Sequence, residues 1–250
     1  MKVSIITSCY NRVLTIRGAI ESVLAQDFED IEYIIVDGAS KDGSVDVIEE
    51  YRNRVAVILS EPDHGMYEAI NKGIRMATGD VIGLVHSDDF LYDRHVISDV
   101  VRNFERTGAD FVYGDGIFVD AENTDKPVRN WVGGNYHKWK VRCGWLPLHP
   151  TCYIRREVMM REGLYDESYK IAADSDFLVR YLYEADLNVQ YMKRKIIRMR
   201  MGGLSTDRKK RKQMWDEDVR MYRSHGFSPI PTKIMKMMWK VPQFVEAKFI

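Results

Sequence analysis

The sequence predicts an α/β fold with a doubly wound, mainly parallel central sheet flanked by helices. Three observations support this prediction. Four short runs rich in β-branched residues have the length of buried strands, helical patterns of apolar residues separate them, and the alternation continues to about residue 115. The four runs are residues 3–7, 33–36, 55–59 and 81–85.

Helices are expected between these strands. Apolar residues recur at helical spacing in 16–24, in 67–77 and in 96–104, and a further strand is expected at 111–113. Periodicity then fades, so residues 121–145 are expected to form a loop. It returns with a predicted strand at 151–154 and a predicted helix around 177–182.

Composition excludes several classes of protein. The 250 residues carry 37 Lys and Arg against 37 Asp and Glu, so no global positive field favours nucleic acid as a partner. No apolar run approaches the roughly 20 residues that span a bilayer. The first residues lack the apolar core of a signal peptide, and three scattered cysteines suggest no disulfide framework. A cytoplasmic protein is therefore expected.

Polar residues follow each of the first four predicted strands. They lie at 8–12, 37–44, 61–65 and 86–89, and in a parallel sheet these segments meet at one edge, where ligands bind. No glycine-rich phosphate loop follows the first strand. Asp88 and Asp89 offer oxygen ligands to Mg²⁺ or Mn²⁺, which could bridge a diphosphate. An Asp-Asp pair can equally form a turn or a helix cap, and Asp37 before glycine can be a turn former.

Four ordered motifs carry a resemblance to a known family. They are Val3-Ser-Ile-Ile-Thr-Ser-Cys-Tyr-Asn-Arg, Asp37-Gly-Ala-Ser-Lys-Asp-Gly-Ser, Asp63-His-Gly-Met-Tyr-Glu-Ala-Ile-Asn-Lys-Gly and Gly79-Asp. Together they resemble the family 2 glycosyltransferases, which have the GT-A fold and transfer sugars with inversion. The resemblance covers residues 1–205 and is strongest up to Asp89.

The resemblance implies a nucleotide-diphosphate sugar as donor and a divalent metal, Mg²⁺ or Mn²⁺, as cofactor. It places the metal on Asp88 and Asp89. It implies a set of residues that bind the nucleotide sugar: Thr7, Cys9, Tyr10, Asn11, Arg12, Asp37, Asp63, Asn71, Lys72, His86 and Ser87. One departure concerns the metal motif, because the family's Asp-x-Asp stands here as His86-Ser87-Asp88.

The acceptor side is expected in the second half of the chain. Inverting transfer needs a base that takes the proton of the attacking hydroxyl. The stretch 171–177 is similar to the family segment that ends in this base, which makes Asp174 the candidate, with Ala173 in place of the usual Glu. His149 and Asp176 are expected on the acceptor side. Asp174 and Asp176 could also be charges at a helix N-terminus, and His149 a structural histidine.

A change of composition predicts a boundary near residue 206. Residues 1–205 would form the catalytic domain, with a donor half at 1–95 and an acceptor half at 96–205, and 206–250 a basic amphipathic helical tail. In the tail, Ile234, Met237, Met238 and Val241 share one helix face, and Lys233, Lys236 and Lys240 another. With the basic run 208–212, this tail would bind an anionic membrane surface; alternatively its apolar face packs on the protein.

The sequence therefore predicts an inverting glycosyltransferase that acts on a saccharide or polyprenyl-linked acceptor in the synthesis of a surface polysaccharide such as capsule, O-antigen or exopolysaccharide. It would lie in the cytoplasm, at the inner face of the cell membrane. Two alternatives stay open. One is a non-catalytic nucleotide-sugar-binding protein; the other is a sugar-phosphate nucleotidyltransferase, whose glycine-rich basic first loop is absent from residues 8–12.

Overall fold

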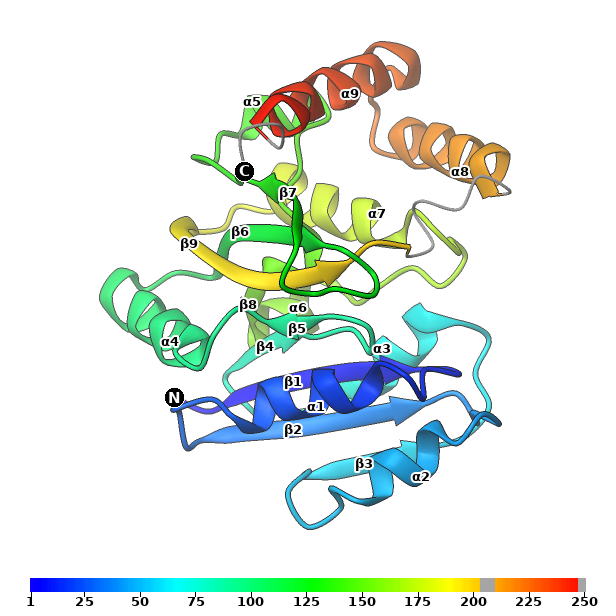
Figure 1. The fold of residues 1–250 in the computed structure, drawn as a ribbon. Coiled ribbons are helices and arrows are strands. Elements are labelled where there is room, and N and C mark those ends of the chain that lie inside the picture. The colour runs from blue at the N-terminus through cyan, green and yellow to red at the C-terminus, as the bar shows by residue number, and fades with distance from the viewer. Residues whose placement is uncertain (203–209, 247–250) are drawn as a thin grey trace.

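The structure is a computed structural model that describes residues 1–202 and 210–246. Within this part of the chain a single nine-stranded sheet forms the centre (Figure 1). Its strands are β1 (Val3–Cys9), β2 (Ile31–Asp37), β3 (Val57–Ser60), β4 (Val81–Leu84), β5 (Phe90–Leu91), β6 (Phe111–Val119), β7 (Pro127–Trp131), β8 (Tyr153–Arg155) and β9 (Val189–Arg200).

The strand order is β3-β2-β1-β4-β8-β6-β9-β5, and β7 pairs with the free part of β6. The first four strands are all parallel, and β6 is parallel to β9. Strand β8 lies antiparallel between β4 and β6 and so joins the two halves of the sheet. The sheet thus has a parallel half, formed by β1 to β4, and a mixed second half.

Helices cover both faces of the sheet. They are α1 (Ile16–Leu24), α2 (Ser44–Glu49), α3 (Met66–Met76), α4 (Val96–Thr107), α5 (Lys138–Arg142), α6 (Arg156–Glu162), α7 (Ala173–Val179), α8 (Arg211–Ser224) and α9 (Pro229–Glu246), with a 3₁₀ turn η1 (His149–Thr151) and a π-helical turn η2 (Arg180–Glu184). One apolar core contains the buried faces of α1, α2 and α4, and the other those of α3, α6, α7 and α8. Two cores on opposite faces confirm the doubly wound α/β prediction.

Two expectations from the sequence need correction. Residues 121–145 are not only loop, because they contain β7, which pairs with β6, and helix α5. The strand expected from residue 151 begins at Tyr153, after η1. Local periodicity did not reveal β7 because its five residues are exposed or only partly buried, so no buried apolar pattern marks the strand, although it forms a hairpin with the preceding strand β6.

The C-terminal helices pack on the same body as the sheet. Met221 and Tyr222 of α8 are fully buried in the core that contains α7. The Glu217 carboxylate of α8 accepts backbone hydrogen bonds at 2.8–3.0 Å from residues 170, 171 and 172, just before α7. The predicted boundary at residue 206 lies outside the described residues. Helix α8 therefore holds the segment that leads into α7.

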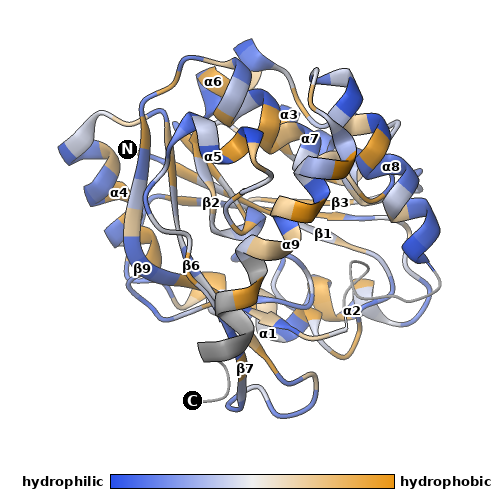
Figure 2. Cartoon of the chain, turned by 90° about the horizontal axis from the view of Figure 1, so that it is seen from above, coloured by the Kyte–Doolittle hydropathy of each residue, from blue (hydrophilic) through white to orange (hydrophobic). Residues whose placement is uncertain are grey.

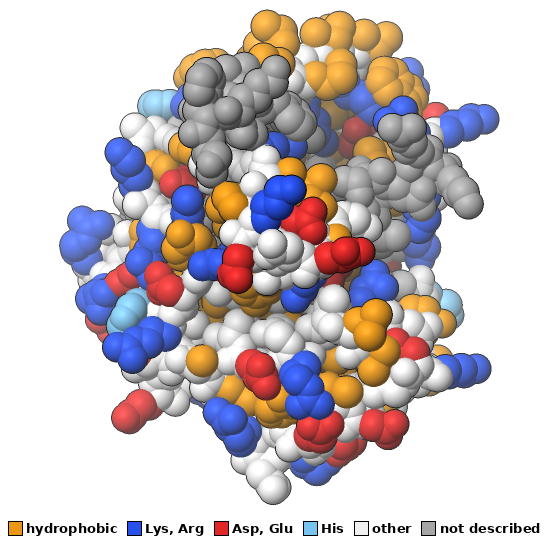
Figure 3. Space-filling model, viewed as in Figure 1, with side chains coloured by type: hydrophobic (Ala, Val, Ile, Leu, Met, Phe, Trp, Pro, Cys, Tyr) orange, Lys and Arg blue, Asp and Glu red, His pale blue; other side chains and the backbone are white. Residues whose placement is uncertain are grey.

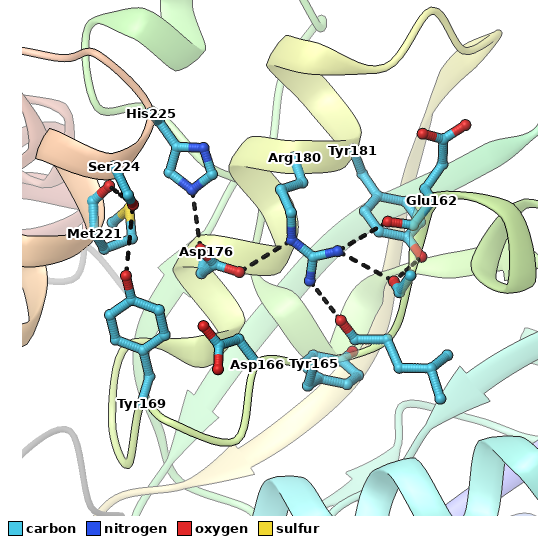
Figure 4. Close-up of polar contacts among 12 residues, drawn as sticks. Glu162, Tyr165, Asp166, Tyr169, Asp176, Arg180, Tyr181, Met221, Ser224 and His225 are labelled. Atoms are coloured by element: carbon cyan, nitrogen blue, oxygen red, sulfur yellow. Dashed lines mark hydrogen bonds and ion pairs between the residues drawn. The ribbon is translucent and has the colours of Figure 1, made fainter.

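A buried ion-pair network also fastens α8 to α7 (Figure 4). The Asp176 carboxylate accepts a hydrogen bond from Arg180 at 3.0 Å and pairs with His225 at 2.9 Å. His225 also contacts Glu184 at 2.7 Å, and its side chain is only 6% exposed. Burial alone would lower the pKa of His225, but the hydrogen bonds to Asp176 and Glu184 outweigh it and raise the pKa. The folded protein therefore favours protonated His225.

Helix α9 has the opposite orientation to that expected if its apolar face packed on the protein. Lys233 and Lys236 point inward and contact the Asp218 carboxylate of α8, Lys233 at 2.7 Å and Lys236 at 3.5 Å. The predicted apolar face points outward, and Met237 and Met238 are 59% and 58% exposed. Seen from above, α9 runs from α8 towards β7 (Figure 2). The buried ion pair with Asp218 thus decides which face of the helix is exposed.

Within the described residues, no helix is both long and apolar enough to cross a bilayer. This agrees with the absence of a long apolar run in the sequence.

Replacing Gly83 by alanine should destabilise the sheet. Gly83 of β4 lies opposite Tyr153 of β8, and a Cβ atom there would lie 2.3 Å from the tyrosine ring. Overpacking of this kind costs about 1–3 kcal/mol in the free energy of unfolding, which urea denaturation would measure. Gly18→Ala in α1 is the matched control, because a Cβ there meets nothing closer than 3.8 Å and gains helix propensity. Equal effects of the two variants would contradict this packing.

Replacing His225 by glutamine should lower stability most at acidic pH. Because the pKa of His225 is raised, its stabilisation is fully present below the unfolded value of 6.5 and is lost as pH rises through the folded value. Charge-assisted hydrogen bonds of this kind contribute about 1.5–3 kcal/mol. Melting temperatures of wild type and His225→Gln should differ more at about pH 5.5 than at about pH 8.5. A gap that is constant with pH would contradict the network, and exposed His137→Gln serves as control.

Candidate active site

The turns after β1 and β2 lock together at the carboxyl edge of the parallel strands. The Ser40 hydroxyl accepts a hydrogen bond from the Asn11 backbone at 2.8 Å, and the Ser44 hydroxyl accepts one from Arg12 at 2.7 Å. The Asn11 side chain in turn accepts one from Lys41 at 2.9 Å. The two predicted nucleotide-binding motifs therefore form a single structural unit.

This unit carries unusual backbone geometry. Asn11 and Ala39 have φ values of 51° and 59°, and they are the non-glycine residues with positive φ among those described. The left-handed region is costly for alanine and persists where surrounding contacts enforce it, often at ligand sites. The strain therefore marks the same edge that the motifs mark.

Tyr10 and Asp63 come together across Gly38. A Cβ atom on Gly38 would lie 2.5 Å from the Asp63 carboxylate and 3.3 Å from the Tyr10 ring, so only glycine fits between them. The Tyr10 side chain is 59% exposed. The exposed ring of Tyr10 is suited to stacking on a nucleotide base, and the carboxylate of Asp63 is suited to accepting hydrogen bonds from ribose hydroxyls.

Four residues of the predicted donor set have structural roles. The Thr7 hydroxyl donates to the Val85 carbonyl at 2.7 Å within the core, and Cys9 is buried with its pKa raised to about 12, chiefly by that burial. Asn71 bonds both backbone groups of Tyr165. Asp37 is fully buried and accepts hydrogen bonds from Ser40 and Ser60, so it shapes the turn from within. In this structure the hydrogen bonds of Thr7, Asp37 and Asn71 are thus made within the protein.

The rest of the donor set lies nearer the surface or at the end of β4. Arg12 is exposed, and Lys72 forms ion pairs with Glu61 and Glu68 at 2.8 and 3.0 Å. Ser87 is buried beside His86 in the turn after β4.

Asp88 and Asp89 have different surroundings. Asp89 is buried and accepts a hydrogen bond from the Arg200 backbone at 3.1 Å, and burial followed by the charge of Asp88 raises its pKa. Asp88 is partly exposed, and no hydrogen bond to its carboxylate is found within residues 1–202 and 210–246. Asp88 is therefore the carboxylate that is free to bind a ligand.

These residues fit a metal ion that arrives together with a diphosphate. Within the described part of the chain, no three His, Cys, Asp or Glu side chains are grouped so as to hold an ion by themselves. Mg²⁺ is commonly bound by one or two carboxylates, with phosphate oxygens and waters completing its shell. The single free carboxylate of Asp88 matches that pattern. The described residues do not form a cage that would hold the ion without the diphosphate.

An aromatic chain connects the end of β4 with the acceptor side. The rings of His86 and His149 stack at 6.2 Å, and His149 contacts the Tyr165 hydroxyl at 2.8 Å. Burial, aided by His86, lowers the pKa of His149 to about 3, so the imidazole is neutral at physiological pH. Tyr165 stacks on Phe177 at 4.2 Å. The predicted acceptor residue His149 is thus a buried link between the two halves.

Asp174 lies at the start of α7 in an environment that suits a base. Burial raises the pKa of its carboxyl group, and the charge of Lys236 opposes this rise. Among the described groups, its carboxylate accepts one backbone hydrogen bond, from Ser175 at 2.6 Å. By contrast Asp176 is held by Arg180 and His225, which keep its pKa below the usual range despite burial. Asp174 is therefore the available carboxylate of the two.

Two residues of the C-terminal helices belong to this site and were missed by sequence reasoning. Glu217 fixes the backbone before α7, and Lys236 lies close enough to Asp174 to influence its pKa. Both lie in the segment that was expected to be a separate tail. The sequence signal was the presence of lysines in an otherwise apolar helix, but the sequence does not show that Lys233 and Lys236 point inward.

A cavity of about 420 Å³ lies beside α8, and Glu217, which bonds the backbone before α7, is one of its lining residues. It is lined by Ser168 and by residues of α8, among them Glu217 and Arg220, and contains none of the predicted site residues. Its location does not change the assignment of the site.

Comparison with known proteins places this geometry in a family. The sequence profile of Glycosyl transferase family 2 matches residues 4–167. A PGL/p-HBAD biosynthesis glycosyltransferase of Mycobacterium bovis is 28% identical over 193 residues, which are 76% of this chain and 73% of that protein. An uncharacterized glycosyltransferase of Mycobacterium tuberculosis is 30% identical over 180 residues, covering 71% and 68% of the two chains.

Solved structures agree on the fold. The Staphylococcus aureus protein TarS, residues 1–349 with UDP-GlcNAc, superposes with a TM-score of 0.72 at 16% identity, over 99% of this chain and 79% of that one. The mannosyltransferase PcManGT of Pyrobaculum calidifontis, with GDP-Man and Mn²⁺, gives 0.63 at 15% identity, over 98% and 73%. The sheet, its edge and the profile match together confirm the expected GT-A fold and transferase class, and the chain belongs to Glycosyl transferase family 2.

Proposed function

We propose that the protein transfers one sugar, with inversion, from a nucleotide-diphosphate sugar to a hydroxyl of a saccharide or polyprenyl-linked saccharide. The observation that carries this proposal is the contrast between Asp174 and Asp176 at the start of α7. The carboxyl group of Asp174 has a raised pKa and is hydrogen-bonded to Ser175, whereas Asp176 is occupied by Arg180 and His225. Pairs of carboxylates with opposite environments are characteristic of acid-base sites.

The donor would bind along the edge formed by the turns after β1, β2 and β3. Tyr10 would stack on the base, and Asp63 would accept hydrogen bonds from the ribose. The Asp88 carboxylate would be a ligand of a Mg²⁺ or Mn²⁺ ion, whose charge would stabilise the departing diphosphate. Support for this donor class comes from the neighbours solved with UDP-GlcNAc and with GDP-Man.

Asp174 would take the proton from the acceptor hydroxyl as the oxygen attacks the anomeric carbon, while the bond to the diphosphate breaks on the opposite face of the sugar. Its raised pKa makes it a stronger base than an exposed aspartate. The charge of Lys236 opposes this rise in pKa and so favours the ionised form of the carboxyl group. We assign the product to surface polysaccharide synthesis in the cytoplasm, at the inner face of the cell membrane.

Removing the base should abolish most of the transfer. With a panel of UDP-, GDP- and dTDP-sugars and either Mn²⁺, Mg²⁺ or EDTA, release of nucleoside diphosphate in the presence of acceptor should require metal. Asp174→Asn should lower kcat by about 10²–10⁴-fold, the usual contribution of a general base. Asp88→Ala should raise the metal concentration needed, and exposed Asp186→Asn is the matched control. Turnover that survives Asp174→Asn would eliminate this base.

The pH dependence of kcat/KM should show the effect of Lys236 on the pKa of the base Asp174. Transfer should fall on the acid side as Asp174 becomes protonated, and Lys236 lowers the pKa of this carboxyl group. In Lys236→Met the acid limb of kcat/KM should therefore move to higher pH. Lys126→Met is the control, because Lys126 is exposed and is not among the groups that shift the pKa of Asp174. An unmoved acid limb in Lys236→Met would show that Asp174 is not the titrating base.

A further inference from the structure

An exposed apolar surface lies at the end of the molecule formed by α9. Its residues recur at the spacing of one helix stripe and are 49–63% exposed: Ile230, Ile234, Met237, Met238 and Val241. Figure 3 shows hydrophobic side chains gathered at the top of the molecule, where α9 lies in the same view. We call this stripe the α9 face. Monomeric proteins rarely leave such a continuous apolar stripe without a partner.

Helix α5 extends this surface. Its Trp139 is 58% exposed, and the ring lies 6.3 Å from that of Trp239 on α9. The indole of Trp239 donates a hydrogen bond to the Cys143 carbonyl at 3.0 Å. Gly144 fits closely under α9, because a Cβ atom there would lie 2.5 Å from the Thr232 carbonyl. The two segments thus form one surface, although nearly 100 residues separate them.

The outward orientation of the α9 face is fixed from the inside. Lys233 and Asp218 form an ion pair at 2.7 Å in which both side chains are about nine-tenths buried. Turning the apolar stripe inward would move Lys233 into solvent and leave the Asp218 carboxylate as an uncompensated buried charge, which is strongly unfavourable. The exposed stripe is therefore a stable property of the fold.

Charge distinguishes between the partners that could cover this surface. Although the chain contains 37 Asp and Glu, residues 126–156 and 219–245 contain none. Lys138 and Arg142 of α5 are exposed beside Trp139. In a twofold dimer the same patch would face itself and bring the Lys138 and Arg142 side chains of the two copies together, which is unfavourable between like charges. An anionic surface is the complementary partner.

We propose that the α9 face, together with Trp139, Lys138 and Arg142, binds a membrane surface that contains anionic phospholipid. The methionines and isoleucines would enter the boundary between headgroups and acyl chains, the tryptophan would lie at headgroup depth, and the cations of α5 would contact lipid phosphates. The basic charge at the lipid would thus come from α5, since Lys233 and Lys236 point inward.

This placement also brings the site close to the membrane. Lys236 on the inner side of α9 influences Asp174, and the exposed stripe lies on the outer side of the same helix. A helix with its side chains is about 10–12 Å across. If the proposed function holds, an acceptor anchored in the bilayer would present its hydroxyl to Asp174 without leaving the membrane.

Co-sedimentation with vesicles tests the surface separately from the chemistry. The full chain should bind vesicles of phosphatidylcholine with phosphatidylglycerol, and bind phosphatidylcholine alone more weakly. The double variant Met237→Glu, Met238→Glu should lower binding to the anionic vesicles by more than about tenfold. Met160→Glu is the matched control, because Met160 is an exposed methionine of α6, away from α9.

Separate readouts distinguish the possible failures. The double variant should keep wild-type circular dichroism and, without vesicles, wild-type release of nucleoside diphosphate, which tests folding and the proposed function independently of lipid. Equal vesicle binding by wild type and double variant, or no binding by wild type at low salt, would overturn the proposal. A wild-type dimer in light scattering that the double variant dissociates, without vesicle binding, would assign the face to a second copy.

Discussion

The donor side of the molecule depends on the parallel pairing of β1 with both β2 and β4. This pairing aligns Cys9 with Asp37 and brings Val81 of β4 beside Val3, so the turns that follow the strands emerge at one edge. The turns after β1 and β2 then interlock through Ser40 and Ser44. Without this register the strained backbone at Ala39 would have no contacts to maintain it.

The segment that carries the candidate base depends on contacts from the end of the chain. Glu217 satisfies three backbone N–H groups before α7, and His225 pairs with Asp176 one turn into the helix. Helix α9 then brings Lys236 to Asp174 from the other side. The two C-terminal helices thus position and tune the candidate base, although they contribute no residue that would act on the sugar directly.

The two faces of α9 have different partners for electrostatic reasons. Its lysines reach inward because Asp218 is buried and needs a cation, and this requirement leaves the apolar stripe in solvent. A helix of this kind can connect a surface event to a buried site with no large movement. On the proposed functions, one helix would contact lipid on one side and the base on the other.

The sequence by itself determined the parts of the protein that depend on local patterns. Strand and helix periodicity predicted β1, α1, β2, α3, β4 and α4, and ordered polar motifs predicted both the family and the edge that carries them. The candidate base Asp174 came from a motif as well. The predictions of these elements and of the family were confirmed because short-range periodicity and motif order are written in consecutive residues, whereas the role of Asp174 stays a prediction.

Only the tertiary structure decided which of these polar residues are buried in contacts within the protein and which are free. It placed Thr7, Asp37 and Asn71 in supporting contacts, separated free Asp88 from buried Asp89, and revealed β7 in a segment expected to be loop. It also turned the lysines of α9 inward. The physical reason is that burial and the choice of an ion-pair partner arise from contacts between residues far apart in the chain, and that a strand such as β7, whose residues are exposed or only partly buried, carries no buried apolar pattern.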